Sequence, residues 1–123
     1  SNDDETLAGI QGVYEDCGYV MDTHTAVAMD VYDKYVIKTG DLTQTVIVST
    51  ASPFKFNRSV AAALLNGEAE EKTEFELLPM LAEKTGWEIP EGLRGLDQKE
   101  IMHRTVCEKD EMCSALMKLL DID

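Results

Sequence analysis

A chain of 123 residues is long enough for one domain with a real core and short for a complete metabolic enzyme. Its net charge of −13 argues against nucleic acid or an anionic membrane surface as a partner, because phosphate groups are bound by clustered Lys and Arg. No apolar run approaches the roughly 20 residues that cross a bilayer, and no signal-peptide pattern opens the chain. With three cysteines, one stays unpaired in any disulfide scheme, so we expect a cytoplasmic protein.

The N-terminal segment predicts a first helix. Residues 1–2 are interpreted as the remnant of a cleaved tag, which leaves residues 3–123 as a single domain. Asp3 or Asp4 is then the expected N-cap, because a short carboxylate accepts a hydrogen bond from the free amides of a first turn. Gly18 supplies the left-handed residue that ends a helix.

A second helix is predicted after Asp22, and it runs to about Lys38 before Gly40 ends it. The helical period divides its side chains into two faces. The side chains expected to point inward are Val27, Val31, Tyr32, Tyr35 and Val36, and those expected to face solvent are Asp30, Asp33 and Lys34.

One strand is predicted, over about residues 45–50, from the β-branched run between Thr45 and Ser49. Apolar and polar residues alternate little along this run, which is typical of a strand covered on both faces, as in a parallel sheet. No second segment of similar quality exists in the chain. We therefore expect an α/β class, a mostly helical piece with one main buried strand whose neighbours belong to another part of the protein or to another copy.

The second half of the chain predicts three more helices. The first covers residues 57–65, with Asn57 as its N-cap. The next either begins near Leu78 or kinks, because Pro79 disrupts a helix begun at the capping box of Thr73. A similar capping box at Thr105 predicts the start of the last helix.

An anion site is one interpretation of the end of the predicted strand. No acid lies between residues 42 and 67, whereas Lys55 and Arg58 do. The hydroxyls of residues 49–52 come at the carboxyl end of the strand, where ligands of α/β sheets gather. Free amides at a helix start after Asn57 would add to the attraction. The alternative is an ordinary strand-to-helix connection, and the residue pattern leaves both open.

Two segments resemble a known family. Residues 22–27 are similar to the Asp-x-His-Thr-Ala segment of threonine synthases, and residues 46–56 are similar to their Thr-Ala-His-Pro-x-Lys-Phe segment. The two follow each other in the family's order and at a similar separation. Ser52 and Phe54 depart from the pattern, since they replace a His and a small residue, so any role of that His is lost or supplied elsewhere.

The resemblance implies the pyridoxal-phosphate (PLP) fold shared with tryptophan synthase β chains. It implies the conversion of O-phosphohomoserine and water into threonine and inorganic phosphate. Thr50 matches the hydroxyl residue that faces the pyridine nitrogen of PLP. Lys55 matches a motif lysine that could hold the substrate phosphate. His24 is expected to line or brace the substrate site.

The same resemblance implies that the chain is a C-terminal piece, inactive by itself and without a catalytic residue of its own. The Schiff-base lysine and the glycine-rich phosphate cradle belong to earlier segments of the family, and PLP is not held covalently without that lysine. The expected partners are the N-terminal portion of the same enzyme and O-phosphohomoserine, with self-association of the piece as a further expectation.

Two alternatives stay open at this point. The chain could be a free-standing acidic regulatory or protein-interaction module, or part of a threonine-synthase-like phospholyase that takes a different phosphorylated amino acid. A metal site at Asp22, His24, Asp30 and Asp33 is disfavoured, because Asp30 and Asp33 lie on the expected solvent face.

Overall fold

The computed structural model describes residues 1–122, and within them it is mostly helical, without a β-strand. The elements in chain order are α1 (Asp3–Cys17), α2 (Thr23–Thr39), the 3-10 turn η1 (Pro53–Phe56), α3 (Asn57–Leu64), α4 (Glu74–Thr85), the short turns η2 (Leu96–Gln98) and η3 (Lys109–Glu111), and α5 (Met112–Leu119). No helix in this part of the chain is long and apolar enough to cross a membrane. The predicted mostly helical character is confirmed.

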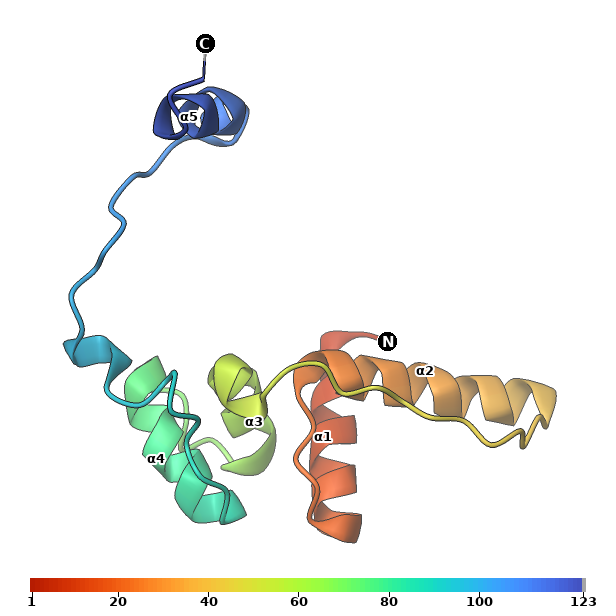
Figure 1. The fold of residues 1–123 in the computed structure, drawn as a ribbon. Helices are drawn as coiled ribbons and strands as arrows, with labels where there is room; N and C mark the ends of the chain where they lie inside the picture. The colour runs from red at the N-terminus through yellow and green to blue at the C-terminus, as the bar shows by residue number, and fades with distance from the viewer. Residues whose placement is uncertain (123) are drawn as a thin grey trace.

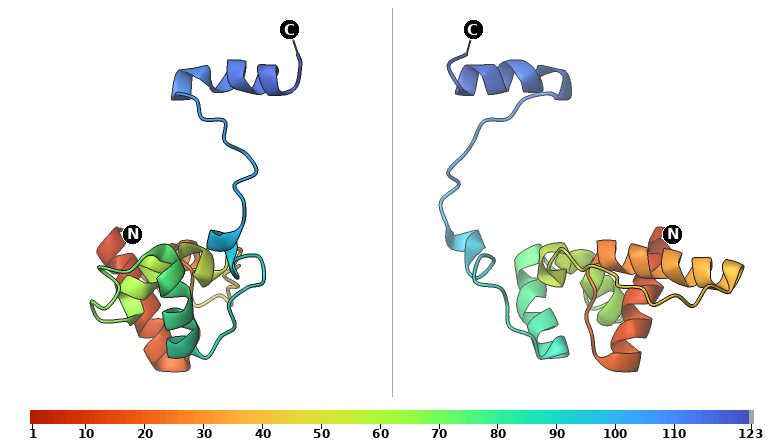
Figure 2. Two further views of the ribbon diagram at one scale, coloured as in Figure 1. Left: turned by 90° about the vertical axis from the view of Figure 1, so that its left-hand side faces the viewer. Right: turned by 45° about the vertical axis from the view of Figure 1, so that its right-hand side comes forward.

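Helices α1 to α4 form the packed body of the molecule. Helix α3 lies in the middle, where it contacts α1 on one side and α4 on the other, and α1 also packs against α2 (Figure 1). The body then leads through an extended segment to α5, which stands apart from it in every view (Figure 2). The buried apolar residues are Ile10, Val20, Met21, Ala26, Phe54, Val60, Ala61, Ala63, Leu64, Leu65, Ala69, Leu77, Leu78 and Leu81.

The predicted helix stops are confirmed, and one predicted cap is wrong. Gly18 and Gly40 both adopt the left-handed conformation and end α1 and α2. The cap of α1, however, is Asn2, whose side chain accepts from the backbone of Glu5 while the Glu5 carboxylate accepts from the backbone of Asn2. The predicted cap at Asp3 or Asp4 is wrong because residue 2, interpreted as part of a tag remnant, belongs to the helix start.

Helix α2 exposes three of the five side chains predicted to point inward, whereas Tyr32 and Val36 are half-buried. Val27, Val31 and Tyr35 are 39%, 50% and 48% exposed. The side that meets α1 instead carries the fully buried Ala26 and Met29, which packs against the core. The period located the apolar stripe correctly, but among the described residues no element covers it.

The predicted strand is not formed in this chain. Residues 45–50 run as an extended segment back along α2 (Figure 1), with no strand assignment, and Val46 and Val48 are 81% and 72% exposed. The prediction of a buried strand is therefore wrong for this chain alone. The physical reason is that a strand needs a neighbour to pair its backbone groups, and residues 1–122 supply none.

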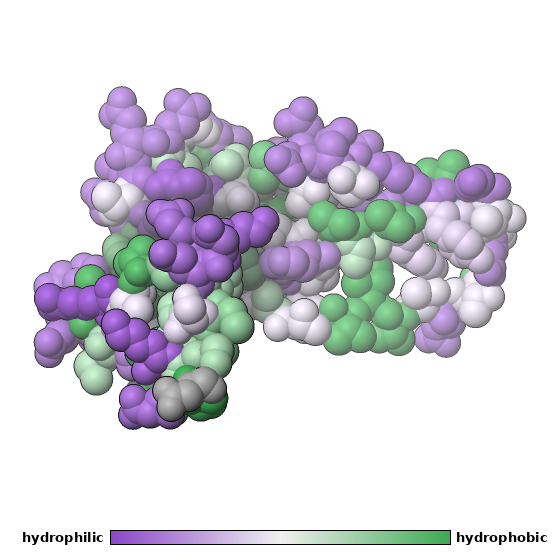
Figure 3. Space-filling model, turned by 90° about the horizontal axis from the view of Figure 1, so that it is seen from above, coloured by the Kyte–Doolittle hydropathy of each residue, from purple (hydrophilic) through white to green (hydrophobic). Residues whose placement is uncertain are grey.

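An open apolar face results from these two findings. Seen from above, apolar side chains gather on the arm of the molecule that α2 and the extended segment build (Figure 3). We use the name open apolar face for the exposed large apolar residues of α2 and the extended segment, which are Val27, Val31, Tyr35, Ile37, Leu42, Val46 and Val48.

Helix α4 begins at its capping box. Thr73 accepts from the backbone of Glu76, and Glu76 accepts in return from the backbone of Thr73. Pro79 lies inside the helix on the exposed side, so the alternative start near Leu78 is wrong. The helix thus continues through Pro79 although proline cannot donate a backbone hydrogen bond there.

Two further predicted caps are wrong. Asn57 is buried, and its side chain donates to the carbonyl of Glu74 at 2.8 Å, so it joins α3 to α4 and does not cap α3. Helix α5 is preceded by a capping box of Glu108 and Glu111, not by one at Thr105. A tertiary contact with α4 uses the side chain of Asn57, and a neighbouring capping box replaces the one predicted at Thr105.

Truncation of the core tests this packing. Leu77→Ala removes a side chain with no exposure, and we expect it to lower the free energy of unfolding by about 2–5 kcal/mol in urea denaturation. The matched control is Leu42→Ala, at a side chain that is 83% exposed, which should change it by less than about 0.5 kcal/mol. Equal effects of the two variants would contradict the described core.

Candidate functional site

The centre of the candidate site is the carboxylate of Asp22, which caps α2 and has no solvent exposure. Its Oδ1 accepts from the backbone amide of His24 at 2.9 Å and lies 2.9 Å from Nδ1 of the same residue. Its Oδ2 accepts from the hydroxyl of Thr25. A buried charge needs such donors, because an unpaired carboxylate away from water is costly.

The carboxylate also reaches the end of the extended segment. Ser49 Oγ lies 3.1 Å from Thr25 Oγ1 and 3.5 Å from Asp22 Oδ2, so its proton has an acceptor in either atom. This contact spans more than twenty residues of sequence. It ties the start of α2 to the carboxyl end of the extended segment, and so joins the two segments that the sequence analysis singled out.

An aromatic contact connects η1 to the same place. The rings of Phe56 and His24 meet edge to face, with centroids 4.7 Å apart. Lys55 Nζ lies 5.8 Å from the centre of the Phe56 ring. The imidazole of His24 is therefore held on one side by a carboxylate and on another by an aromatic ring.

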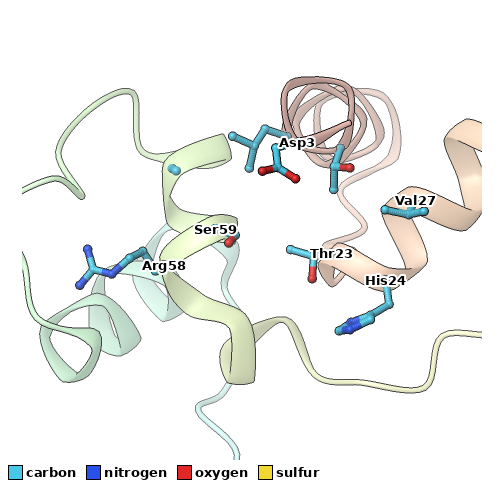
Figure 4. Close-up of a pocket in the computed structure, with 9 residues that line it drawn as sticks. Asp3, Thr23, His24, Val27, Arg58 and Ser59 are labelled. Carbon is cyan, nitrogen blue, oxygen red and sulfur yellow. The ribbon is translucent and has the colours of Figure 1, made fainter. Parts of the chain in front are cut away.

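A hollow of about 600 Å³ opens between the starts of α1 and α2 and the side of α3 (Figure 4). Its wall is formed by Asp3, Thr6, Leu7, Thr23, His24, Val27, Arg58, Ser59 and Ala62. The guanidinium of Arg58 points away from this hollow in the close-up. His24 is the residue that belongs both to the hollow and to the Asp22 network.

The three predicted site residues all have exposed side chains. Thr50 and Lys55 are exposed, and the side chain of His24 is 64% exposed. Among the described residues, Lys55 Nζ takes part in no ion pair. The binding roles assigned to these three residues stay predictions.

Arg58 does not support the anion site that its sequence position suggested. Its Nε bonds a carboxylate oxygen of Glu74 at 3.0 Å, and its Nη2 donates to the carbonyl of Lys72 at 2.8 Å. The guanidinium thus pins the link before α4 to α3. This leaves Lys55 as the cation of the acid-free window that forms no ion pair within residues 1–122.

The sequence predicted no role for Thr25, named Ser49 only among the hydroxyls of the anion-site interpretation, and named Asp22 as a site residue only in the disfavoured metal site. Asp22 at a helix N-cap reads locally as a capping residue, which it is. The run Asp22-Thr23-His24-Thr25 indicates a local hydrogen-bond network around the carboxylate. The contact of this network with Ser49 depends on the tertiary fold.

The pKa of Asp22 lies below its ordinary value of 3.8. Burial raises this pKa, and hydrogen bonds from the Thr25 hydroxyl and from the backbone and ring of His24 outweigh that effect. The group therefore stays ionised at neutral pH and acts as a pure acceptor.

The comparisons with known proteins identify the family of the chain. The family model described as "Threonine synthase, C-terminal" matches residues 25–114, which include Thr25, Ser49 and the segment between them. The chain belongs to the threonine synthase C-terminal family. The predicted resemblance to threonine synthases is thereby confirmed.

Individual relatives carry the same family name. The threonine synthase of Schizosaccharomyces pombe is 41% identical over 64 residues, which cover 51% of this chain and 12% of that protein. Threonine synthase-like 1 of Homo sapiens is 34% identical over 114 residues, which cover 86% of this chain and 14% of the human protein. The chain therefore spans between 12% and 14% of the length of these threonine synthase relatives.

The residues of this threonine synthase family chain do not by themselves fit PLP. A bound PLP needs a lysine for its aldehyde and a cradle of backbone amides for its phosphate. Within residues 1–122 the glycines that adopt a positive φ end helices or lie in turns, and none follows a strand as a phosphate loop does. Thr50 can offer one hydroxyl to a ring held by other residues.

The ionised Asp22 makes a prediction about acid stability. Asp22→Asn should lower the free energy of unfolding by about 1–3 kcal/mol at pH 7, because the buried hydroxyl of Thr25 and the imidazole of His24 lose a charged acceptor. Since the folded-state pKa is depressed, this difference is complete above the ordinary value of 3.8 and disappears as the pH falls through the lowered value.

Urea denaturation of both proteins between about pH 7 and pH 2 measures this difference. Asp33→Asn, at an exposed aspartate of the same helix, is the matched control and should shift stability little. A difference for Asp22→Asn that persists unchanged at the acid end would contradict the ionised state.

Proposed function

We propose that this chain is the C-terminal part of an enzyme that converts O-phosphohomoserine and water into threonine and phosphate with PLP. The observation that carries the proposal is the Asp22 network, in which Thr25 and Ser49 from the two family segments lie in hydrogen-bond contact. In a chain of the threonine synthase C-terminal family, this contact gives the two segments one common place in the molecule. It argues for a shared site built from both.

Thr50 is the residue proposed to face the cofactor. Successive side chains of an extended backbone point to opposite sides, so the contact of the Ser49 hydroxyl with Asp22 turns the exposed Thr50 away from Asp22. A neutral hydroxyl opposite the pyridine nitrogen suits chemistry that does not need a fully protonated ring, for which bound PLP supplies an electron sink.

Lys55 is proposed to attract the substrate phosphate. Its ammonium is exposed, forms no ion pair within the described part of the chain, and lies in the stretch between residues 42 and 67 that has no acid. In a protein with a net charge of −13 this stretch is where a phosphate meets least repulsion. His24 is proposed to contact the substrate nearby.

The remainder of the enzyme is the proposed partner of the open apolar face. Relatives of this chain are several times longer, and the extended segment carries backbone groups that no strand within residues 1–122 pairs. A strand from the remainder, added beside residues 45–50, would satisfy those groups and cover Val46 and Val48. The expected tryptophan synthase β-like sheet is then completed by both parts.

A second candidate is a threonine-synthase-like phospholyase that acts on another phosphorylated amino acid. The match to human threonine synthase-like 1 favours it, because it covers 86% of this chain, against 51% for the fungal threonine synthase. A free-standing acidic module is less well supported, since such a module would cover its own strand and apolar face.

Activity of the full-length enzyme tests the proposal. Phosphate release from O-phosphohomoserine should require the portion that carries the Schiff-base lysine, and this chain alone should be inactive. Thr50→Val in the full-length enzyme should lower kcat roughly 10-fold, about the value of one hydrogen bond to the ring. Inorganic phosphate measured against time provides the readout.

Thr45→Val is the control, because it makes the same substitution in the same extended segment. It should leave turnover unchanged. Turnover of a different phosphorylated amino acid at a higher kcat/KM would favour the second candidate, and unchanged turnover in Thr50→Val would remove Thr50 from the cofactor's environment.

Hydrogen exchange tests the proposed partner. In this chain alone the amides of residues 45–50 should exchange rapidly, because no sheet protects them. In the full-length enzyme the same amides should be protected, while those of α3 should be protected in both. Equally rapid exchange of residues 45–50 in both proteins would show that no strand joins them.

A further inference from the structure

We propose that Asp22 is a positioning residue that fixes the ring nitrogen through which His24 meets a ligand. The proposal rests on the function proposed above for its claim that the ligand is the substrate. The orientation itself follows from the geometry of the Asp22–His24 pair.

An ionised carboxylate can only accept hydrogen bonds. His24 Nδ1 lies 2.9 Å from Asp22 Oδ1, so Nδ1 must carry a proton. In the neutral imidazole this leaves Nε2 without a proton, and therefore with a free lone pair.

Three further contacts restrain the orientation of the carboxylate and of the ring. The same Oδ1 atom accepts from the backbone amide of His24, which keeps the carboxylate in the plane that Nδ1 reaches. Oδ2 is occupied by the hydroxyl of Thr25, so the carboxylate cannot rotate freely. The Phe56 ring packs edge to face against the imidazole, with ring centroids 4.7 Å apart, and restricts the rotation of the imidazole.

Nε2 of His24 is then the atom left for a ligand. Within residues 1–122 it takes part in no hydrogen bond, and the side chain is 64% exposed at the wall of the hollow between α1, α2 and α3. A neutral Nε2 accepts a hydrogen bond from an N–H or O–H group. The chemistry fits a small substrate that carries an ammonium or hydroxyl donor, as an amino acid does.

A merely structural Asp22 would stabilise the helix start and leave the tautomer undetermined. A positioning Asp22 selects the tautomer, because water by itself does not prefer Nδ1–H in an exposed histidine. The two roles therefore differ in a quantity that is independent of activity.

Long-range proton–nitrogen NMR of the full chain, in buffer alkaline enough for neutral imidazole, measures this tautomer. The neutral ring of His24 should carry its proton on Nδ1. His103, the other histidine of the sequence, is the internal reference, since no hydrogen bond to its side chain is found in the described residues. A proton on Nε2 of His24 in the unchanged protein would overturn the proposal without any variant.

Three substitutions sharpen the test. Asp22→Ala should move the proton to Nε2 or to a mixture resembling His103, and Asp22→Asn should retain Nδ1–H because its amide oxygen still accepts. Thr25→Val, which removes a hydroxyl from the same buried network at nearly constant volume, should lower stability and leave the tautomer unchanged. An unchanged tautomer in folded Asp22→Ala would assign Asp22 a structural role only.

Kinetics of the full-length enzyme separate this proposal from the function on which it rests. Asp22→Ala and His24→Ala should each lower kcat/KM by roughly 10- to 100-fold, and the double variant should lose no more than the His24 variant alone. Additive losses would overturn the claim that Asp22 acts through His24. With the Nδ1–H tautomer observed and O-phosphohomoserine not turned over, the proposed function fails and the positioning of His24 stands.

Discussion

The buried carboxylate of Asp22 is the constraint on which the local structure depends. Removing a charge from water costs several kcal/mol, and the cost is met only when strong donors surround the group. Here the donors come from the first turn of α2 and from the end of the extended segment. Both carboxylate oxygens already accept hydrogen bonds within α2, and Ser49 Oγ adds a further contact 3.5 Å from Oδ2. This contact places the carboxyl end of the extended segment beside the start of α2.

A second constraint is left unmet by the described residues. The open apolar face exposes Val31 and Val46, and the backbone of residues 45–50 has no pairing strand. Water can satisfy the backbone groups, whereas the exposed valines keep their hydrophobic cost. One end of the segment is thus fixed by a buried network and the rest is left open. This combination is expected of a chain whose core is completed elsewhere, and it agrees with relatives several times longer.

Local signals could be read from the sequence, and contacts between distant segments could not. The stops at Gly18 and Gly40 were predicted because a helix end is decided by a few neighbouring residues, whereas the start at the Thr73 capping box was left open because of Pro79. The buried face of α2 was predicted wrongly, because the period marks an apolar stripe and does not say which neighbour covers it. The strand failed for the same reason, since pairing is a property of two segments. Asp22 was visible as a cap, but its contact with Ser49 depends on the path of the chain between them.

The Asp22 network couples the two features that the proposed function needs. Ser49 is at once a partner of the carboxylate and the residue before Thr50, and His24 is held by the other oxygen of the same carboxylate. A strand that pairs with residues 45–50 would fix the distance between the Ser49 hydroxyl and the Asp22 carboxylate. One carboxylate therefore contacts both the residue that precedes Thr50 and the imidazole of His24. A cofactor contact on one side of the segment and a substrate contact at the start of α2 would thus be brought into register by the same buried charge.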